Sequence, residues 1–580
     1  MSVAGEGSTE PLLDIANLAN SSINNSEVFT SELFVYYRER DVVPMQSNRK
    51  HGVVICLLII VLLVGTRFIG LRFNMEIHPD EDKFYQAVTS LLHSLLDPNV
   101  EFKEVKEYPE GAYLFQLPFQ ALGAAIGHFT GSIQEPQVWG RIASVFYLGL
   151  SGILGMAILD RYLGKSRLSA GIFGLTLCFS LFFIEHSRYG VGDMISLFLL
   201  LLIILLTAKA CEKENSHWYL LLAFAACGAM GSVKYPQVIF GLIPLSVFWY
   251  DRKRMPWKLW KRRLLLYGLT AFVTFLLFSP KAMFDWRYFY RVIRRESDAY
   301  LISGTTFEAG GFLNHIAAMT LYSLLYADFP LAILLLILCF SEQFRTNRAL
   351  LSSEGIDAQK RLGFLFSYVV PGMTILFFVY NLIPTLLIYR TYTPFFGLSA
   401  LYCSNFAGKL VEKGHWRRYA MWILMALMIL RGAGLMFITA SPERAKQDFG
   451  AQVYQAADEN WSSTILLGKY IMPFDKTDLK EPVELNIGEW KEYNGSTELT
   501  SGTLVVTGAY PFALAEEYLI PANTRDAQTI AQWQEFVQTN SEYFVGQSYP
   551  DFVYYLFGGW LRGGTLSTSM IPCNYIYYCP

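Results

Sequence analysis

Residues 191–210 read VGDMISLFLLLLIILLTAKA, an apolar run with one acid, Asp193, near its start and one base, Lys209, near its end. A helix of about 20 apolar residues matches the hydrocarbon thickness of a bilayer. Comparable runs lie at residues 52–71, 138–159, 168–186, 217–234, 236–251, 264–280, 315–341, 362–381, 388–408 and 418–439. The sequence therefore predicts a mainly α, polytopic membrane protein of about eleven spans.

The amino-acid composition is typical of a protein that is partly embedded in lipid. The chain has 580 residues, of which 53% are apolar and only 17% charged, and its net charge is −2. The basic residues do not form one large patch but are distributed among short connections between the apolar runs. This distribution gives no indication of nucleic-acid binding and carries topological information instead.

Lys and Arg residues recur in alternate connections, which predicts that these connections are cytoplasmic. In this frame residues 1–50 are a cytoplasmic, largely disordered tail, residues 51–440 form the membrane domain, and residues 441–580 form a domain outside the cytoplasm. The first outer loop, 72–137, contains two helix-like stretches, 84–97 and 111–130, which we predict to lie at the outer interface. We expect a multi-pass protein of the plasma or inner membrane.

The region after residue 440 has a soluble composition. The stretch GTLVVTG at 502–508 is typical of a strand, and the run 526–545 is helix-like, so a small α+β domain is expected. Cys573 and Cys579 lie close together there and could form a disulfide if this domain is outside the cytoplasm.

Four polar motifs fall at the predicted outer face. The first outer loop contains HPDED at 78–82, and EHSRYGVGD at 185–193 joins two spans. Lys234 and Tyr235 follow the fifth run, and RTYTP begins at Arg390. Taken singly, the acids are also explained as helix caps and the cations and tyrosines as interfacial anchors. Their shared membrane level favours a common site.

With these motifs in this order, residues 50–440 resemble the GT-C superfamily of membrane glycosyltransferases. The similarity is to the family 39 protein mannosyltransferases and to the aminoarabinose transferase of lipid A. The resemblance implies a GT-C type fold and a polyprenyl-phosphate-linked sugar donor. It also implies transfer to an acceptor hydroxyl of a protein, lipid or glycan at the outer face. Direct displacement would invert the anomeric configuration.

The resemblance also assigns candidate roles to residues. Asp80 matches the general-base position, and its neighbour Glu81 is expected to assist by binding the acceptor or holding the loop. Asp193 and His78 are candidates for binding the acceptor or orienting the loop. Candidates for binding the donor phosphate are Lys234, Arg390, Arg188, Tyr392, Arg294 and Arg295. Arg294 and Arg295 belong to a basic cluster on the otherwise less basic outer side.

No cofactor is predicted to be required. His78, Asp80 and Glu81 could bind a divalent metal, but adjacent loop residues seldom complete a coordination shell. The expected partners are the lipid-linked donor, membrane lipid and an unidentified acceptor. A transporter or flippase of a lipid-linked glycan is the alternative, with Asp328 and Arg431 as its midplane candidates. A noncatalytic membrane scaffold is a third reading.

Overall fold

The computed structural model describes most of the chain from residue 49 to 458. The described ranges, with gaps at 70 and 98, are 49–71, 79–99, 110–131, 136–212, 217–301, 357–382, 389–412, 415–439 and 442–458. Further described residues are 316, 319, 340–344 without 342, 464–468, 482–485, 501–508, 535–547 without 537, and 574–579. The chain divides into two compact units, Met1–Ile55 and Cys56–Pro580, and of the first only the start of a helix is described.

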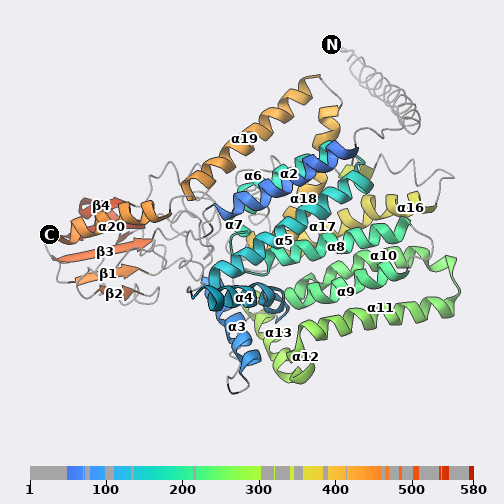
Figure 1. Cartoon of the computed structure of the whole chain (residues 1–580), viewed down its shortest axis with the longest axis horizontal. Helices are drawn as coiled ribbons and strands as arrows, with labels where there is room; N and C mark the ends of the chain where they lie inside the picture. The colour runs from blue at the N-terminus through green and yellow to red at the C-terminus, as the bar shows by residue number, and fades with distance from the viewer. Residues whose placement is uncertain are drawn as a thin grey trace, which may run out of the picture. The chain divides into compact units, whose positions relative to one another are not determined.

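Helices dominate the described chain up to residue 458 (Figure 1). They are α2 (Arg49–Phe68), α3 (Pro79–Leu96), α4 (Glu110–Thr130), α5 (Pro136–Ile158), η1 (Leu159–Leu163), α6 (Arg167–Phe179), α7 (Leu181–His186), α8 (Asp193–Glu212), α9 (His217–Val233), η2 (Tyr235–Gly241), α10 (Leu242–Tyr250), η3 (Asp251–Arg254), α11 (Trp257–Phe278), α12 (Pro280–Phe284), α13 (Trp286–Leu301), α16 (Asp357–Phe364), η4 (Leu365–Val369), α17 (Val370–Leu382), η5 (Tyr389–Tyr392), α18 (Thr393–Glu412), α19 (His415–Thr439) and α20 (Pro442–Asp458). The prediction of a mainly helical fold is confirmed.

Four described helical stretches are long and apolar enough to cross a membrane: Pro136–Leu163, Asp193–Glu212, Asp357–Leu382 and Trp416–Met436. These helices support the prediction of an integral membrane protein. The other predicted runs coincide with shorter or less apolar helical elements, except 315–341, which lies almost entirely outside the described residues. The count of eleven spans and their sidedness stay predictions.

The run predicted as one span at 168–186 is divided in the structure. Helix α6 ends at Phe179, Ser180 has an extended backbone with ψ 131°, and α7 begins at Leu181. The break shifts the direction of the chain just before the 185–193 motif. The run 362–381 is also irregular, because it contains the five-residue π-helix η4.

Helix α8 forms the centre of the packing. It is apolar on all sides and packs against α5 and α9, as expected of a helix enclosed by others. Helices α2, α5 and α6 approach closely at glycines. A Cβ at Gly152 would lie 3.0 Å from side-chain atoms of Ile60 and Leu63 of α2. Small residues at such crossings let backbones approach, which is the usual way helices associate in membranes.

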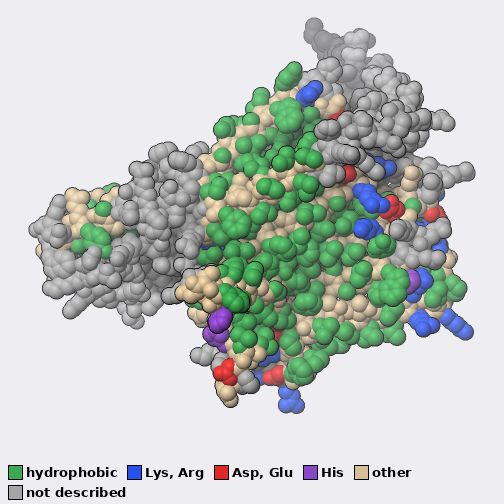
Figure 2. All heavy atoms as spheres, viewed as in Figure 1, with side chains coloured by type: hydrophobic (Ala, Val, Ile, Leu, Met, Phe, Trp, Pro, Cys, Tyr) green, Lys and Arg blue, Asp and Glu red, His purple; other side chains and the backbone are tan. Residues whose placement is uncertain are grey.

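Large apolar side chains remain exposed on the outside of the helical region. Figure 2 shows a broad, nearly continuous apolar surface over these helices. Exposed Leu, Ile, Val and Phe side chains lie on α2 after residue 55, on α11 and on α19. A surface of this kind is unfavourable in water and is typical of contact with a bilayer.

The C-terminal region contains a mixed sheet with strand order β2-β1-β3-β5-β4. The strands are β1 (Thr464–Gly468), β2 (Pro482–Leu485), β3 (Thr503–Gly508), β4 (Phe544–Gln547) and β5 (Asn574–Cys579). β1 is parallel to β2 and β3, whereas β5 is antiparallel to β3 and β4. Helix α20 packs Phe449 and Val453 against strand residues such as Leu504 and Ile576.

Two sequence predictions fall on this sheet. The stretch 502–508 was predicted as a strand, and it forms β3. The helix-like run 526–545 differs at its end, because Phe544 and Val545 belong to β4, and Phe544 pairs with Tyr577 of β5. Residues 526–534 lie outside the described residues.

Candidate functional site

A buried ion pair joins helix α3 to helix α5. The Glu81 carboxylate accepts hydrogen bonds from Nε and Nη2 of Arg141, each at 2.7 Å, and both side chains are 1% exposed. Nη1 of Arg141 donates to the Leu71 carbonyl at 2.7 Å. This two-point geometry is the strongest form of a carboxylate–guanidinium contact, and it offsets much of the cost of removing both charges from water.

The local sequence explains how Glu81 reaches this position. Pro79 is the first residue of α3, where its fixed φ and missing N–H suit a helix start. Asp80, Glu81 and Asp82 follow in the first turn, where negative charge is favoured by the helix dipole. The turn therefore forms from its own sequence, and the contact with Arg141 fixes its location.

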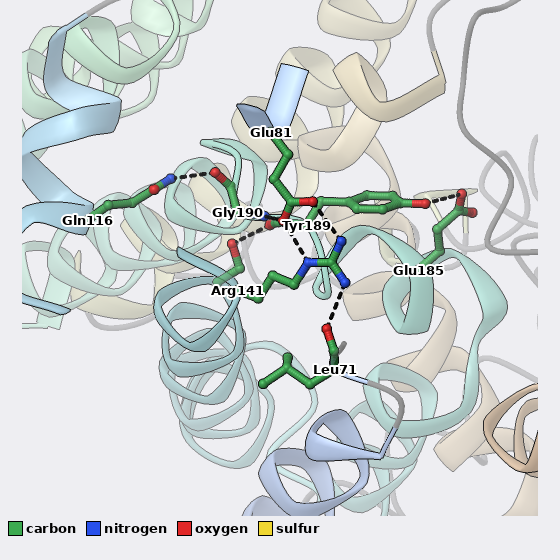
Figure 3. A network of polar contacts seen from close by, with 8 residues as sticks. Leu71, Glu81, Gln116, Arg141, Glu185, Tyr189 and Gly190 are labelled. Carbon is green, nitrogen blue, oxygen red and sulfur yellow. Dashed lines mark hydrogen bonds and ion pairs between the residues drawn. The ribbon is translucent and has the colours of Figure 1, made fainter. Parts of the chain in front are cut away.

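The turn after α7 is held by three different elements (Figure 3). The Gly190 N–H donates to Oε1 of Glu81 at 2.8 Å, and Nε2 of Gln116 from α4 donates to the Gly190 carbonyl at 2.8 Å. Oγ of Ser144 from α5 donates to the Tyr189 carbonyl at 2.6 Å. The first and second sequence motifs are thus in direct contact.

Gly190 lies at a close contact between the turn, α5 and α3. A Cβ at this residue would lie 3.1 Å from the carbonyl carbon of Gly140 and 3.3 Å from Oε1 of Glu81. A side chain would therefore require the turn or its neighbours to shift by a few tenths of an ångström. The glycine therefore permits the backbone contact with Glu81.

The second and third motifs are joined by another ion pair. Nζ of Lys234 contacts Oδ1 of Asp193. Asp193 is the first residue of α8 and is 1% exposed, whereas Lys234 directly follows α9 and is 25% exposed. A carboxylate at a helix start is favoured by the helix dipole. Asp193 therefore holds Lys234 near the turn while part of the lysine side chain stays accessible.

Helix α4 is attached to the segment after α11. Oε2 of Glu110, the first residue of α4, accepts a hydrogen bond from the Lys281 backbone N–H at 2.8 Å. Burial raises the pKa of Glu110, and this backbone hydrogen bond opposes the shift. Burial lowers the pKa of the Lys281 side chain, with Asp285 acting in the opposite direction.

Arg67 explains how the break between α6 and α7 is tolerated. In a continuous helix the carbonyls of Leu177 and Cys178 would accept bonds from residues four positions later. The break removes these bonds, and the fully buried guanidinium of Arg67 donates to both carbonyls, at 2.9 Å for Cys178. An arginine of α2 thus stabilises the bend that leads into the 185–193 motif.

Arg188, a predicted phosphate ligand, is fully buried in that motif. Burial, with further contributions from the nearby Arg67 and Arg141 charges, lowers its pKa to about 9. Three arginines therefore share one buried region with the Glu81 carboxylate. In this conformation the Arg188 side chain belongs to the interior rather than to an accessible surface.

The fourth motif lies at the start of α18. Arg390 is half-buried in η5, and the buried Tyr392 hydroxyl donates to the Asn381 carbonyl at 2.5 Å. Two residues after the motif, Phe396 packs on Phe182 of α7 with ring centroids 4.4 Å apart. The motif is thus next to the bent segment that carries the second motif, although the Tyr392 hydroxyl itself bonds to backbone.

Several predicted residues are not tested by the structure. His78 lies outside the described residues, as do the side chains of Asp80 and Arg295. Arg294 is exposed on α13. Their predicted roles stay predictions.

The predicted disulfide and metal site also stay predictions. Cys579 is a buried free thiol in β5, and Cys573 lies outside the described residues. Within the described part of the chain, no group of three or more His, Cys, Asp and Glu residues could hold a metal ion.

Sequence reasoning missed Arg67, Arg141, Gln116 and Glu110. A usable signal existed for the two arginines, because both occur in predicted spanning runs, where an unpaired cation is costly. Such residues need buried partners, so both arginines could have been marked as structural residues from the sequence. Gln116 and Glu110 carry no comparable local signal.

Comparison with known proteins gives one family match. A model of the dolichyl-phosphate-mannose-protein mannosyltransferase family matches residues 124–284. This segment contains Arg141, the 185–193 motif and Lys234. The predicted resemblance to mannosyltransferase-like GT-C proteins is confirmed. No curated protein matches the chain.

Solved structures show distant likeness. ArnT from Cupriavidus metallidurans, bound to undecaprenyl phosphate, is 13% identical, with a TM-score of 0.42 over 90% of this chain and 97% of its own. The archaeal oligosaccharyltransferase AglB from Archaeoglobus fulgidus, in complex with an inhibitory peptide and a dolichol-phosphate, is 11% identical. Its TM-score is 0.44 over 86% of this chain and 73% of its own. At this level of similarity neither structure decides the function of this chain.

Proposed function

We propose that this protein is a membrane glycosyltransferase that moves a sugar from a polyprenyl-phosphate carrier to an acceptor hydroxyl. One observation carries the proposal: three of the four motifs are connected by direct contacts. Glu81 binds Gly190, and Asp193 binds Lys234. These contacts connect the first turn of α3, through the turn at 185–193, to a partly exposed cation. A base and a phosphate ligand are the two groups that the proposed reaction requires. The match to the mannosyltransferase family over residues 124–284 agrees with this chemistry.

A lipid-linked donor fits a site at the predicted outer face. Nucleotide sugars are cytosolic and highly charged, so they do not cross a bilayer unaided. A polyprenyl carrier places its sugar phosphate at the membrane surface, where the four motifs are predicted to lie. The acceptor would be a protein, lipid or glycan hydroxyl.

Asp80 is proposed as the general base. As the acceptor oxygen attacks the anomeric carbon, its proton passes to the Asp80 carboxylate, and the bond between that carbon and the phosphate oxygen breaks. A single displacement of this kind inverts the anomeric configuration. Asp80 is one residue from Glu81, so the anchoring of Glu81 by Arg141 fixes the turn that carries the base.

Lys234 and Arg390 are proposed to stabilise the departing phosphate. Cations at the position where negative charge develops lower the barrier without a proton transfer. Lys234 is held by Asp193 and is partly exposed, and Arg390 is half-buried at the start of the fourth motif. Arg188 is buried, so we assign it a structural role in the turn.

Glu81 was predicted as part of the catalytic pair, and its contacts favour a positioning role. Both of its carboxylate oxygens bind Arg141, and one also accepts from Gly190. These three hydrogen bonds occupy most of the roughly four acceptor positions of a carboxylate. We propose that it holds the loop rather than contacting substrate.

The decisive experiment is sugar transfer from a panel of labelled polyprenyl-phosphate sugars to a membrane extract, using purified protein. Asp80→Asn should lower the rate by about 10²–10⁴, the usual contribution of a general base. Asp82→Asn is the matched control, because it removes the same charge from the same helical turn and should retain near wild-type transfer. A wild-type rate in Asp80→Asn would exclude the assignment. No transfer with any donor would instead favour the flippase, which is tested in liposomes.

A further inference from the structure

The segment between α10 and α11 carries an unusual density of positive charge. Seven of the twelve residues from 252 to 263 are Lys or Arg. Six of them are exposed. Arg254 is paired with acids, and the other five are Arg252, Lys253, Lys258, Lys261 and Arg262. Together with Trp249 and Trp257 these five cations are called the basic collar. Figure 2 shows basic side chains gathered at this end of α10 and α11, next to the apolar surface.

The neighbouring acids do not neutralise the basic collar. Asp251 contacts Arg254 and Arg361, at 3.5 and 3.2 Å, and Asp357 contacts Arg254 at 3.0 Å. Among the described residues no carboxylate forms an ion pair with any of the five collar cations. Asp251 of η3 and Asp357 of α16 thus pair with Arg254 and Arg361, and the collar keeps its net positive charge.

The basic collar is also unfavourable for its own helix. Helix α11 begins at Trp257 with no acid in its first turn and no side-chain cap from Pro256. Lys258 and Lys261 therefore lie at the positive end of the helix dipole, where cations destabilise a helix. An anion bound there would relieve this repulsion and would meet the uncapped N–H groups.

Exposed tryptophans lie beside two of the collar cations. Trp249 and Trp257 are 50% and 60% exposed. The Arg252 guanidinium lies 4.7 Å from the Trp249 ring centroid, and the Lys261 ammonium lies 4.8 Å from that of Trp257. Exposed tryptophans beside cations are typical of the headgroup region of a bilayer.

The basic collar is remote from the proposed transfer site. Helix α11 has 22 residues, so it is about 33 Å long, close to the hydrocarbon thickness of a bilayer. Its far end leads into α12, where the Lys281 backbone binds Glu110 near the site (Figure 1). The collar and the donor-phosphate residues are therefore predicted to face opposite leaflets.

We infer that the basic collar binds anionic phospholipid headgroups in the leaflet opposite the transfer site. The phosphate groups would contact the exposed cations while the tryptophans lie among the headgroups. Several juxtamembrane cations acting together give a marked preference for anionic over zwitterionic lipid. This inference does not depend on the proposed transferase activity.

The test is native mass spectrometry of the purified full chain, titrated with phosphatidylglycerol and, separately, with phosphatidylcholine. The quadruple variant R252Q/K253Q/K258Q/R262Q removes two Lys and two Arg from the collar. Its matched control, K213Q/K413Q/R417Q/R418Q, removes the same charges from other connections on the same predicted side. Wild type and control should bind the first phosphatidylglycerol more than about tenfold tighter than phosphatidylcholine, and the collar variant should lose most of this preference.

A second variant tests whether charge itself is responsible. R252K/R262K keeps the charge and should keep the preference, which also guards against misfolding as the cause of a loss. An unchanged preference in the collar variant would overturn the inference. An equal loss in collar and control variants would also overturn it, because net charge alone would then explain binding.

Discussion

At the scale of single residues, the fully buried Glu81–Arg141 pair is the most consequential contact. Removing one partner leaves an uncompensated charge where water cannot reach it. Replacing both partners by apolar residues removes that charge altogether. Single and double variants therefore distinguish the free-energy cost of an unpaired buried charge from the contribution of the ion pair to stability.

We expect Glu81→Gln and Arg141→Met each to lower the free energy of unfolding by about 3–5 kcal/mol. The double variant Glu81→Leu with Arg141→Met should be less destabilised than the sum of the two single variants. Thermal unfolding of detergent-purified protein, followed by tryptophan fluorescence, measures these differences. Additive losses would show that the two side chains act independently, contrary to the observed geometry.

Glu110 gives a prediction about pH. Its pKa is raised above the ordinary value of 4.5, mainly by burial, so the folded protein favours the neutral carboxyl. Because the pKa of Glu110 is raised in the folded state, the stability that its neutral carboxyl contributes is complete below the pKa of the unfolded state. It is lost as pH rises through the folded pKa.

Glu110→Gln should remove this dependence, because an amide does not ionise and its carbonyl can still accept from the Lys281 N–H. The difference in melting temperature between the variant and the wild type should therefore grow in favour of the variant above pH 4.5 and then level off. A difference in melting temperature that stays constant between about pH 4 and about pH 8 would contradict the raised pKa of Glu110.

At the scale of elements, the bend between α6 and α7 depends on Arg67. We expect Arg67→Met to leave the Leu177 and Cys178 carbonyls without their donors, at a cost of about 1–3 kcal/mol for each buried group. Hydrogen exchange should then accelerate in residues 181–193 and stay unchanged in β1 and β3. In Arg67→Lys the exchange rate of residues 181–193 should lie between those of the wild type and of Arg67→Met. The lysine ammonium donates hydrogen bonds but lacks the planar geometry of the guanidinium. Uniform acceleration throughout the chain would indicate general destabilisation instead.

The same bend shows which element features the sequence predicted. The apolar run 168–186 was predicted as one span, and its limits agree with the start of α6 and the end of α7. The break within it was not predicted because the run contains no proline and its Ser180 is an ordinary helical residue in many contexts. The break exists because a side chain from another helix satisfies the freed carbonyls.

At the scale of the whole molecule, polar residues occur at the two ends of an apolar helical region. One end holds the connected motifs around Glu81 and Lys234, and α11 separates them from the basic collar by about one bilayer thickness. We predict that both groups of charges reach water or headgroups while the helices between them lie in lipid.

The sequence by itself determined the helical membrane fold, the positions of most helices and the motifs to examine. These are local properties, because the length of an apolar run and the polarity of its flanking residues are written in consecutive positions. The sequence also predicted the positions of two site residues in the same way: Asp80 in a turn that starts a helix, and Lys234 directly after an apolar helix.

Only the tertiary structure decided which residues meet. Glu81 and Arg141 are 60 positions apart, and Glu81 and Gly190 are 109 apart, so no local pattern specifies either contact. The proposed positioning role of Glu81, the burial of Arg188 and the bend held by Arg67 all depend on such pairs. Charges removed from water must find partners, and the packing of distant helices determines which partners are within reach.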